Sequence, residues 1–157
     1  MKNNNPGAFI QMAKKHVLGS SGVLQSNTKA LEMFIRAAEL GSADGFMNVG
    51  AFHAGGIAVK PNMMKACSFI EIAAKKGFAE AHQWLANYDP RTGNDKCIKH
   101  LKIAACAGDK GSMDDLMIKY KSNLLSKDDL TQILRDHQAS KDEMKSEDRE
   151  RARLMLH

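Results

Sequence analysis

A short phrase recurs three times along this chain, spaced by 36 and then 31 residues. Each copy begins with a lysine (29, 65 and 96), continues to an Ala-Ala pair and closes on a glycine. Intervals of this length are typical of arrays in which one supersecondary unit stacks on the next. The repeat therefore predicts an all-α fold, an α-solenoid of stacked antiparallel helix hairpins.

The first half of each repeat has the pattern of an amphipathic helix. Counted from its lysine as position 1, positions 2, 6, 9 and 10 are apolar. Position 6 lies four residues after position 2, and positions 9 and 10 lie three and four after position 6, so all four share one helical face. These residues are Ala30, Phe34, Ala37 and Ala38; Ala66, Ile70, Ala73 and Ala74; Cys97, Leu101, Ala104 and Ala105. The small Ala pairs allow a partner helix to approach closely. Glycine at position 13 predicts a helix end with positive φ.

The second half of each repeat predicts another helix, joined to the first by a short turn. Four residues after the glycine comes a small residue, and eight after it an apolar one. The small residues are Gly45, Ala81 and Ser112, and the apolar ones are Val49, Leu85 and Leu116, with Phe52 and Tyr88 three further on. Clusters of Gly, Pro, Asn and Asp at 55–62 and 89–95 predict turns. Residues 22–29 mirror 59–65, so an earlier helix is expected near 8–17.

These patterns divide the chain into an array at 1–121 and a C-terminal segment at 122–157. The array comprises a half-repeat at 7–28 and repeats at 29–64, 65–95 and 96–121. Ser126 and Asp129 form a capping-box pattern that predicts a helix start. Leu130, Ile133, Leu134 and His137 then give that capping helix one face toward the last repeat. The rest is charged, with Ser146 as a second N-cap: either a solvated helix or a tail that orders on a partner.

Composition narrows the classes of function. The chain has 157 residues, 43% hydrophobic and 26% charged, which is ordinary for a globular protein. No apolar stretch approaches the roughly 20 residues of a membrane span. Three cysteines without a C-x-x-C favour a reducing compartment, so we expect a cytoplasmic or nuclear location. The net charge of +5 is split between the first 28 residues and 96–121 rather than gathered in one stripe, so we do not expect nucleic-acid binding.

The paired alanines, the closing glycine, the small residue of the second helix and the Gly/Val turn before Lys-Ala resemble the Sel-one-like repeat, a relative of the tetratricopeptide repeat. The resemblance covers about residues 7–121. Residues 5–13 and 143–149 are similar to those of an algal subgroup of this family. Some members of that subgroup carry a RING-like zinc segment, which is absent here, as is the paired-cysteine pattern of secreted members. The resemblance implies a non-enzymatic protein-binding module, an adaptor or scaffold.

Other chemistry has weaker support in the sequence. Cys97 and His100 lie i, i+3 and could share a metal with Cys106 or His82, but zinc needs about four ligands at a recognised spacing. We interpret Cys97 as a core residue and expect no metal and no cofactor. Gly55-Gly56 lacks the Walker pattern and is interpreted as a connector.

Histidines and the single tryptophan give two further hypotheses. His53 and His82, with Asp44 or Glu80, could form acid/base pairs, but no nucleophile or oxyanion-hole motif accompanies them, so no catalytic residue is expected. Trp84 is either packed against the next repeat, which we favour, or an anchor for a partner.

The resemblance implies that the first helix of each repeat lines a concave surface that binds a peptide or helix of another protein. The residues there that the core does not use are Glu32, Met33, Arg36, Ser68, Phe69, Ile72, Lys99, His100 and Ile103. Arg36 and Lys99 favour an acidic peptide. Equally, Met33, Phe69 and Ile72 could be packing between repeats. We expect neither a membrane nor a small-molecule substrate as a partner. The alternative function is that of a structural subunit in a larger assembly.

Overall fold

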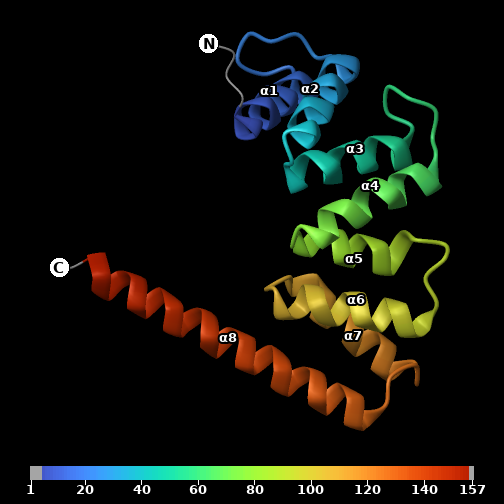
Figure 1. The fold of residues 1–157 in the computed structure, drawn as a ribbon. Coiled ribbons are helices and arrows are strands. Elements are labelled where there is room, and N and C mark those ends of the chain that lie inside the picture. Colours follow the sequence, from blue (N-terminus) through green and yellow to red (C-terminus); the bar gives the residue numbers. More distant parts are fainter. Residues whose placement is uncertain (1–4, 156–157) are drawn as a thin grey trace. The chain divides into compact units, whose positions relative to one another are not determined.

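The computed structural model describes residues 5–155, and these form helices joined by loops, with no strand among them (Figure 1). The helices are α1 (Pro6–Leu18), α2 (Asn27–Glu39), α3 (Ala43–Gly55), α4 (Met63–Lys75), α5 (Ala79–Tyr88), α6 (Asn94–Cys106), α7 (Lys110–Lys121) and α8 (Lys127–Met155). The fold is an all-α, solenoid-type array of helix hairpins. Helix α1 confirms the helix expected near residues 8–17.

The first helices of the repeats are α2, α4 and α6, and their repeated positions form the core. Positions 2, 6, 9 and 10 are buried in all three copies, from Ala30 and Phe34 in α2 to Cys97 and Leu101 in α6. The helical period predicted this burial from the sequence. Cys97 is 4% exposed, which confirms it as a core residue.

The end of each of these helices is built in the same way. Gly41, Gly77 and Gly108 have φ of 87°, 85° and 96°, a region that side chains other than glycine rarely adopt. In the first copy the N–H of Gly41 donates to the carbonyl of Ala38 (2.8 Å), and the N–H of Ser42 donates to Ala37 (3.0 Å). The other copies repeat both bonds, which form a Schellman motif. The Ala-Ala pair therefore supplies the carbonyls that close the helix.

The second helix of each repeat packs its small residue against that same alanine pair. A Cβ on Gly45 would lie 2.6 Å from the backbone N of Ala38 and 2.9 Å from the carbonyl carbon of Ala37. Ala81 and Ser112 are buried at the equivalent positions. Their size limit therefore comes from the adjacent helix.

Near the end of the second helices, the sequence predicts an apolar packing residue in the first two copies, and this holds only in the first. Phe52 is buried and packs edge-on to Phe34, with ring centroids 5.5 Å apart. Its equivalent Tyr88 is 60% exposed, because it is the last residue of the shorter helix α5.

The two long loops, α1 to α2 and α3 to α4, are built alike. Gly19 and Gly56 end the preceding helices in the left-handed conformation, with φ of 63° and 65°. Ser26 and Asn62 then cap α2 and α4 by accepting hydrogen bonds from Lys29 N and Lys65 N. The backbone N–H of each cap also donates to a histidine carbonyl of the preceding helix (2.9 and 2.8 Å). These bonds explain why residues 22–29 mirror 59–65.

The chain divides into two compact units, Met1–Leu85 and Ala86–His157. Unit 1 holds one core cluster over α1, α2 and α3, around Phe34, and a second over α4 and α5, around Ile70 and Leu85. Unit 2 has one cluster in which Leu101 and Leu116 meet Leu125, Leu130 and Ile133.

Helix α8 begins as the sequence predicts and continues further. Ser126 Oγ accepts from Asp129 N (3.0 Å) and donates to the Asp129 carboxylate (2.6 Å). The expectation of a second N-cap at Ser146 was wrong, because the helix runs unbroken from Lys127 to Met155. An N-cap residue requires a turn before it, and Ser146 lies inside a continuous helix. Residues 141–151 are all exposed, in agreement with the solvated-helix interpretation.

The predicted buried face of α8 is narrower than its pattern suggests. Leu130 and Ile133 are 7% and 3% exposed, but Leu134 is 46% exposed, because it lies 100° further round the helix than Ile133. Within residues 5–155, no helix has both the length and the apolar character to cross a bilayer.

This difference gives a stability test of unit 2. We expect Ile133→Ala to lower the free energy of unfolding by about 2–4 kcal/mol, since it leaves a cavity beside Leu101 and Leu116. The neighbouring Leu134→Ala should change it by less than about 0.5 kcal/mol. Urea denaturation measures both, and equal losses would contradict the packing of α8 described above.

Candidate functional site

Positions 4 and 8 of α2, which the core does not use, are polar. Glu32 and Arg36, at positions 4 and 8, are exposed, as predicted. The Arg36 guanidinium donates to the Glu39 carboxylate at 2.9 Å, an exposed pair on the same helix. The positive charge of Arg36 is therefore partly balanced locally, which weakens its preference for an acidic peptide.

The same ridge of α4 is more apolar. Ser68 and Ile72 are exposed, and the Ser68 hydroxyl donates to the Met64 carbonyl (3.0 Å). Met64 is 51% exposed and lies one turn before Ser68. The sequence reasoning missed it because it precedes the Lys65 that opens the repeat. Its spacing of four from Ser68 was the available signal.

Two of the predicted site residues belong to the core instead. Met33 and Phe69 are partly buried and pack against the cluster around Phe34. The Phe69 ring stacks on His53, with centroids 5.6 Å apart and planes 11° apart. For these two residues the contacts agree with the packing interpretation, whereas Ile72 is 37% exposed.

In unit 2, Lys99 and Ile103 are exposed on α6, and His100 is half-buried. Lys99 also lines a hollow of about 310 Å³ between α6 and the start of α8. Its other lining residues are Asp95, Ile98, Lys102, Leu124, Leu125, Asp129, Gln132 and Ile133. The lining is mixed: four apolar side chains, one glutamine, two lysines and two aspartates. Asn94 closes one end by donating to the Leu124 carbonyl (2.9 Å).

An ion pair fixes the edge of this hollow. Lys102 Nζ lies 2.5 Å from the Asp136 carboxylate, which also accepts from the Gln132 amide (2.8 Å). The hydrogen bond from Lys102, with that from Gln132, lowers the pKa of Asp136 below its usual 3.8. The contribution of the pair to stability is therefore present at neutral pH and is lost as pH falls through the lowered value.

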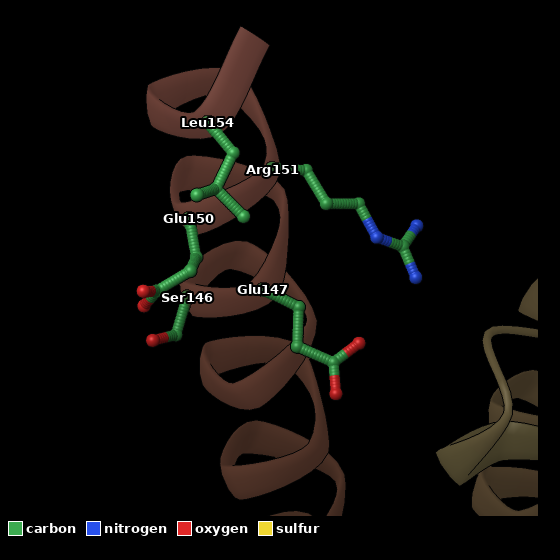
Figure 2. Close-up of a pocket in the computed structure, with 5 residues that line it drawn as sticks. All are labelled: Ser146, Glu147, Glu150, Arg151 and Leu154. Atoms are coloured by element: carbon green, nitrogen blue, oxygen red, sulfur yellow. The ribbon is translucent and has the colours of Figure 1, made fainter. Parts of the chain in front are cut away.

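A second hollow, of about 330 Å³, lies along the last turns of α8 (Figure 2). Its lining residues are Ser146, Glu147, Glu150, Arg151 and Leu154. In the figure Glu147 and Arg151 project from one side of the helix and Ser146 and Glu150 from another. All five come from one helix, so the described residues give this hollow no second wall and no buried polar group.

The acid/base pair hypothesised for Asp44 and His53 is not assembled. Asp44, in the first turn of α3, binds Asn48 (2.6 Å) and faces Lys14 (3.6 Å). His53 lies in the last turn of the same helix, about 13 Å further along at 1.5 Å per residue. Across residues 5–155 no three His, Cys, Asp or Glu side chains gather as metal ligands. Trp84 is partly buried against the cluster around Ile70, which belongs to its own repeat; the expected packing against the next repeat stays a prediction.

The described geometry matches a known family. Residues 11–42, 47–78 and 90–109 match the model of the Sel1 repeat, which is more than half of the chain. The chain therefore belongs to the Sel1 repeat family, whose members generally mediate protein–protein interaction. The first two matched segments join helices across the long loops, α1 with α2 and α3 with α4. The sequence-based repeats divide the same array at a different point.

Two solved structures support the fold. A Sel1 repeat protein from Oxalobacter formigenes superposes with a TM-score of 0.75 and 26% identity, covering 90% of this chain and 60% of that one. A protective antigen present in uropathogenic Escherichia coli strains, which displays an SLR fold, superposes with a TM-score of 0.71 and 21% identity. That match covers 87% of this chain and 31% of the antigen. This chain thus spans less than two thirds of either protein. A search of curated proteins found no significant match.

The ion pair between Lys102 and Asp136 can be tested by measuring the pKa of Asp136. We expect Lys102→Met to raise the pKa of Asp136 toward 3.8, because its strongest hydrogen-bond donor is removed. Carboxyl-carbon NMR titration measures this shift. Lys99→Met removes a neighbouring charge of the same hollow and should leave the Asp136 pKa nearly unchanged; an equal shift in both variants would mean that general charge, not this contact, sets the value.

Proposed function

We propose that this chain is a non-enzymatic protein-binding module that holds a peptide or short helix on the exposed ridges of its first helices. The observation that carries the proposal is the division of labour within these helices. Positions 2, 6, 9 and 10 are buried and apolar in every copy, whereas positions 4 and 8 are exposed. Position 4 differs in each copy (Glu32, Ser68 and Lys99), and position 8 is arginine in the first copy and isoleucine in the other two. A uniform scaffold with varied exposed side chains suits selective binding without chemistry.

In unit 1 the anchor of such a site would be α4. Met64 and Ile72 are exposed apolar residues on one ridge, with Ser68 between them. An apolar side chain of the partner could be desolvated there, while Glu32 on α2 supplies a polar contact. In unit 2, Lys99 and the hollow beside it offer a second contact, for which an acidic group remains the proposed ligand.

Three finer expectations remain proposals. The domain boundaries at 1–121 and 122–157 and the similarity to an algal subgroup rest on the sequence. The alternative function, a subunit of a larger assembly, would use the exposed charged part of α8 as its contact. The ridge is favoured because its exposed position 4 is acidic, neutral and basic in the three copies, whereas the core positions are apolar in all of them.

A peptide-selection experiment tests the ridge. Peptides selected by the intact chain from a random display library should bind Ile72→Asp at least tenfold more weakly, because a charge replaces an apolar contact. Ile118→Asp, a matched change at an exposed residue of α7, should bind them normally. Loss of binding with Ile118→Asp or on deletion of residues 141–157, but not with Ile72→Asp, would contradict the proposal and favour the assembly subunit.

A further inference from the structure

The two long loops of unit 1 emerge at the same edge of the helix layer. Consecutive helices α1 to α4 run in alternating directions, so the ends of α1 and α3 lie beside the starts of α2 and α4 (Figure 1). The short α2–α3 turn lies at the opposite edge. We call residues 15–29 and 53–65 the long-loop edge.

The long-loop edge carries positive charge without any acid. Residues 5–31 and 45–70 contain no Asp or Glu. Lys15, Lys29, Lys60 and Lys65 are exposed there, and no ion pair of the described residues involves them. The nearest acid in sequence is Glu32, one turn along α2 from Lys29, whereas Glu39 is near the short α2–α3 turn and is paired with Arg36.

Two of these lysines stand where a helix would be better served by an acid. Lys29 and Lys65 are the third residues of α2 and α4, and Ser26 and Asn62 cap those helices. Glu at this position completes a capping box and suits the positive helix end. Neither helix has an acid in its first turn. Lys96 holds the same place in α6, so this lysine belongs to the repeat, but α6 has Asp95 in its first turn whereas α2 and α4 have no acid there. At the long-loop edge the charge of these lysines is therefore not balanced within the first turn.

The same edge exposes large apolar side chains on a well-fixed loop. Leu18 is 74% exposed and Leu24 is 88% exposed. The loop does not hang free, because Gln25 Nε2 donates to the Val17 carbonyl (3.1 Å) and Ser26 N donates to the His16 carbonyl (2.9 Å). Ile57 adds a 38% exposed side chain in the second loop.

We propose that the long-loop edge of unit 1 docks on the surface of an anionic lipid bilayer. Basic side chains are attracted to acidic headgroups, and protruding leucines enter the interface between headgroups and acyl chains. A peptide would need walls around its side chains, but Leu18 and Leu24 protrude. This surface mode requires no spanning helix and departs from the sequence-based expectation of no membrane partner.

Sedimentation of the intact chain with vesicles tests the proposal. The chain should bind vesicles of phosphatidylcholine with 30% phosphatidylserine, and binding should weaken in high salt. Vesicles of phosphatidylcholine alone should bind it at least tenfold more weakly. Equal binding to both kinds of vesicle, or none to either, would overturn the proposal.

Charge reversal separates binding from folding. The Lys29→Glu, Lys65→Glu double variant should lose at least tenfold in binding to the anionic vesicles while its melting temperature holds or rises, because both changes complete capping boxes. Lys75→Glu with Lys76→Glu changes the net charge equally at the opposite end of α4 and should bind normally. Equal losses in the two double variants would overturn the assignment to this edge.

Substitution of the exposed leucines tests the apolar part of the proposal independently. Leu18→Ser with Leu24→Ser keeps the charge and removes exposed apolar groups, so we expect about tenfold weaker vesicle binding and an unchanged fold. Unchanged binding would reduce the interaction to general charge attraction and contradict docking of this edge. Binding of soluble polyglutamate or heparin with the same lysine dependence, but not of vesicles, would show a soluble anionic partner and overturn the membrane proposal.

Discussion

The close approach of α3 to the alanine pair of α2 is the contact on which the array depends. Gly45 meets the backbone at Ala37 and Ala38 so closely that a Cβ would lie 2.6 Å from a main-chain atom. The carbonyls of these alanines also accept the hydrogen bonds that end α2. Helix packing and helix termination therefore use the same two residues.

The exposed surfaces of the array are therefore not needed to hold its helices together. Because small residues set the helix spacing, positions 4 and 8 of the first helices are not required for packing and can differ between repeats. The loops are likewise fixed by backbone bonds and caps, so Leu24 can be exposed without loss of order. One scaffold thus presents two chemically distinct surfaces in unit 1: a mixed ridge on α2 and α4, and a basic, apolar edge at the long loops.

The sequence predicted those features that depend on local periodicity. Buried alanines, glycines with positive φ, and the cap at Ser126 all follow from spacing and were confirmed. Met33 and Phe69 could not be assigned in this way, because position 5 lies at the margin of the buried arc and its neighbours decide its exposure. The Ser146 cap failed for the opposite reason: a local signal was overridden by continuation of a formed helix. The hollow beside Lys99 depends on where α8 returns, which no short-range pattern specifies.

The most direct test of this account compares two glycines of α3. Gly45→Ala places a methyl group against the backbone of α2, and the account predicts a loss of about 1–3 kcal/mol in the free energy of unfolding. Gly55→Ala, at the end of the same helix, meets only the flexible Ile57 side chain at 3.3 Å and should be neutral or slightly stabilising. If Gly45→Ala were as stable as Gly55→Ala, close approach at the alanine pair would not be the constraint that organises the fold.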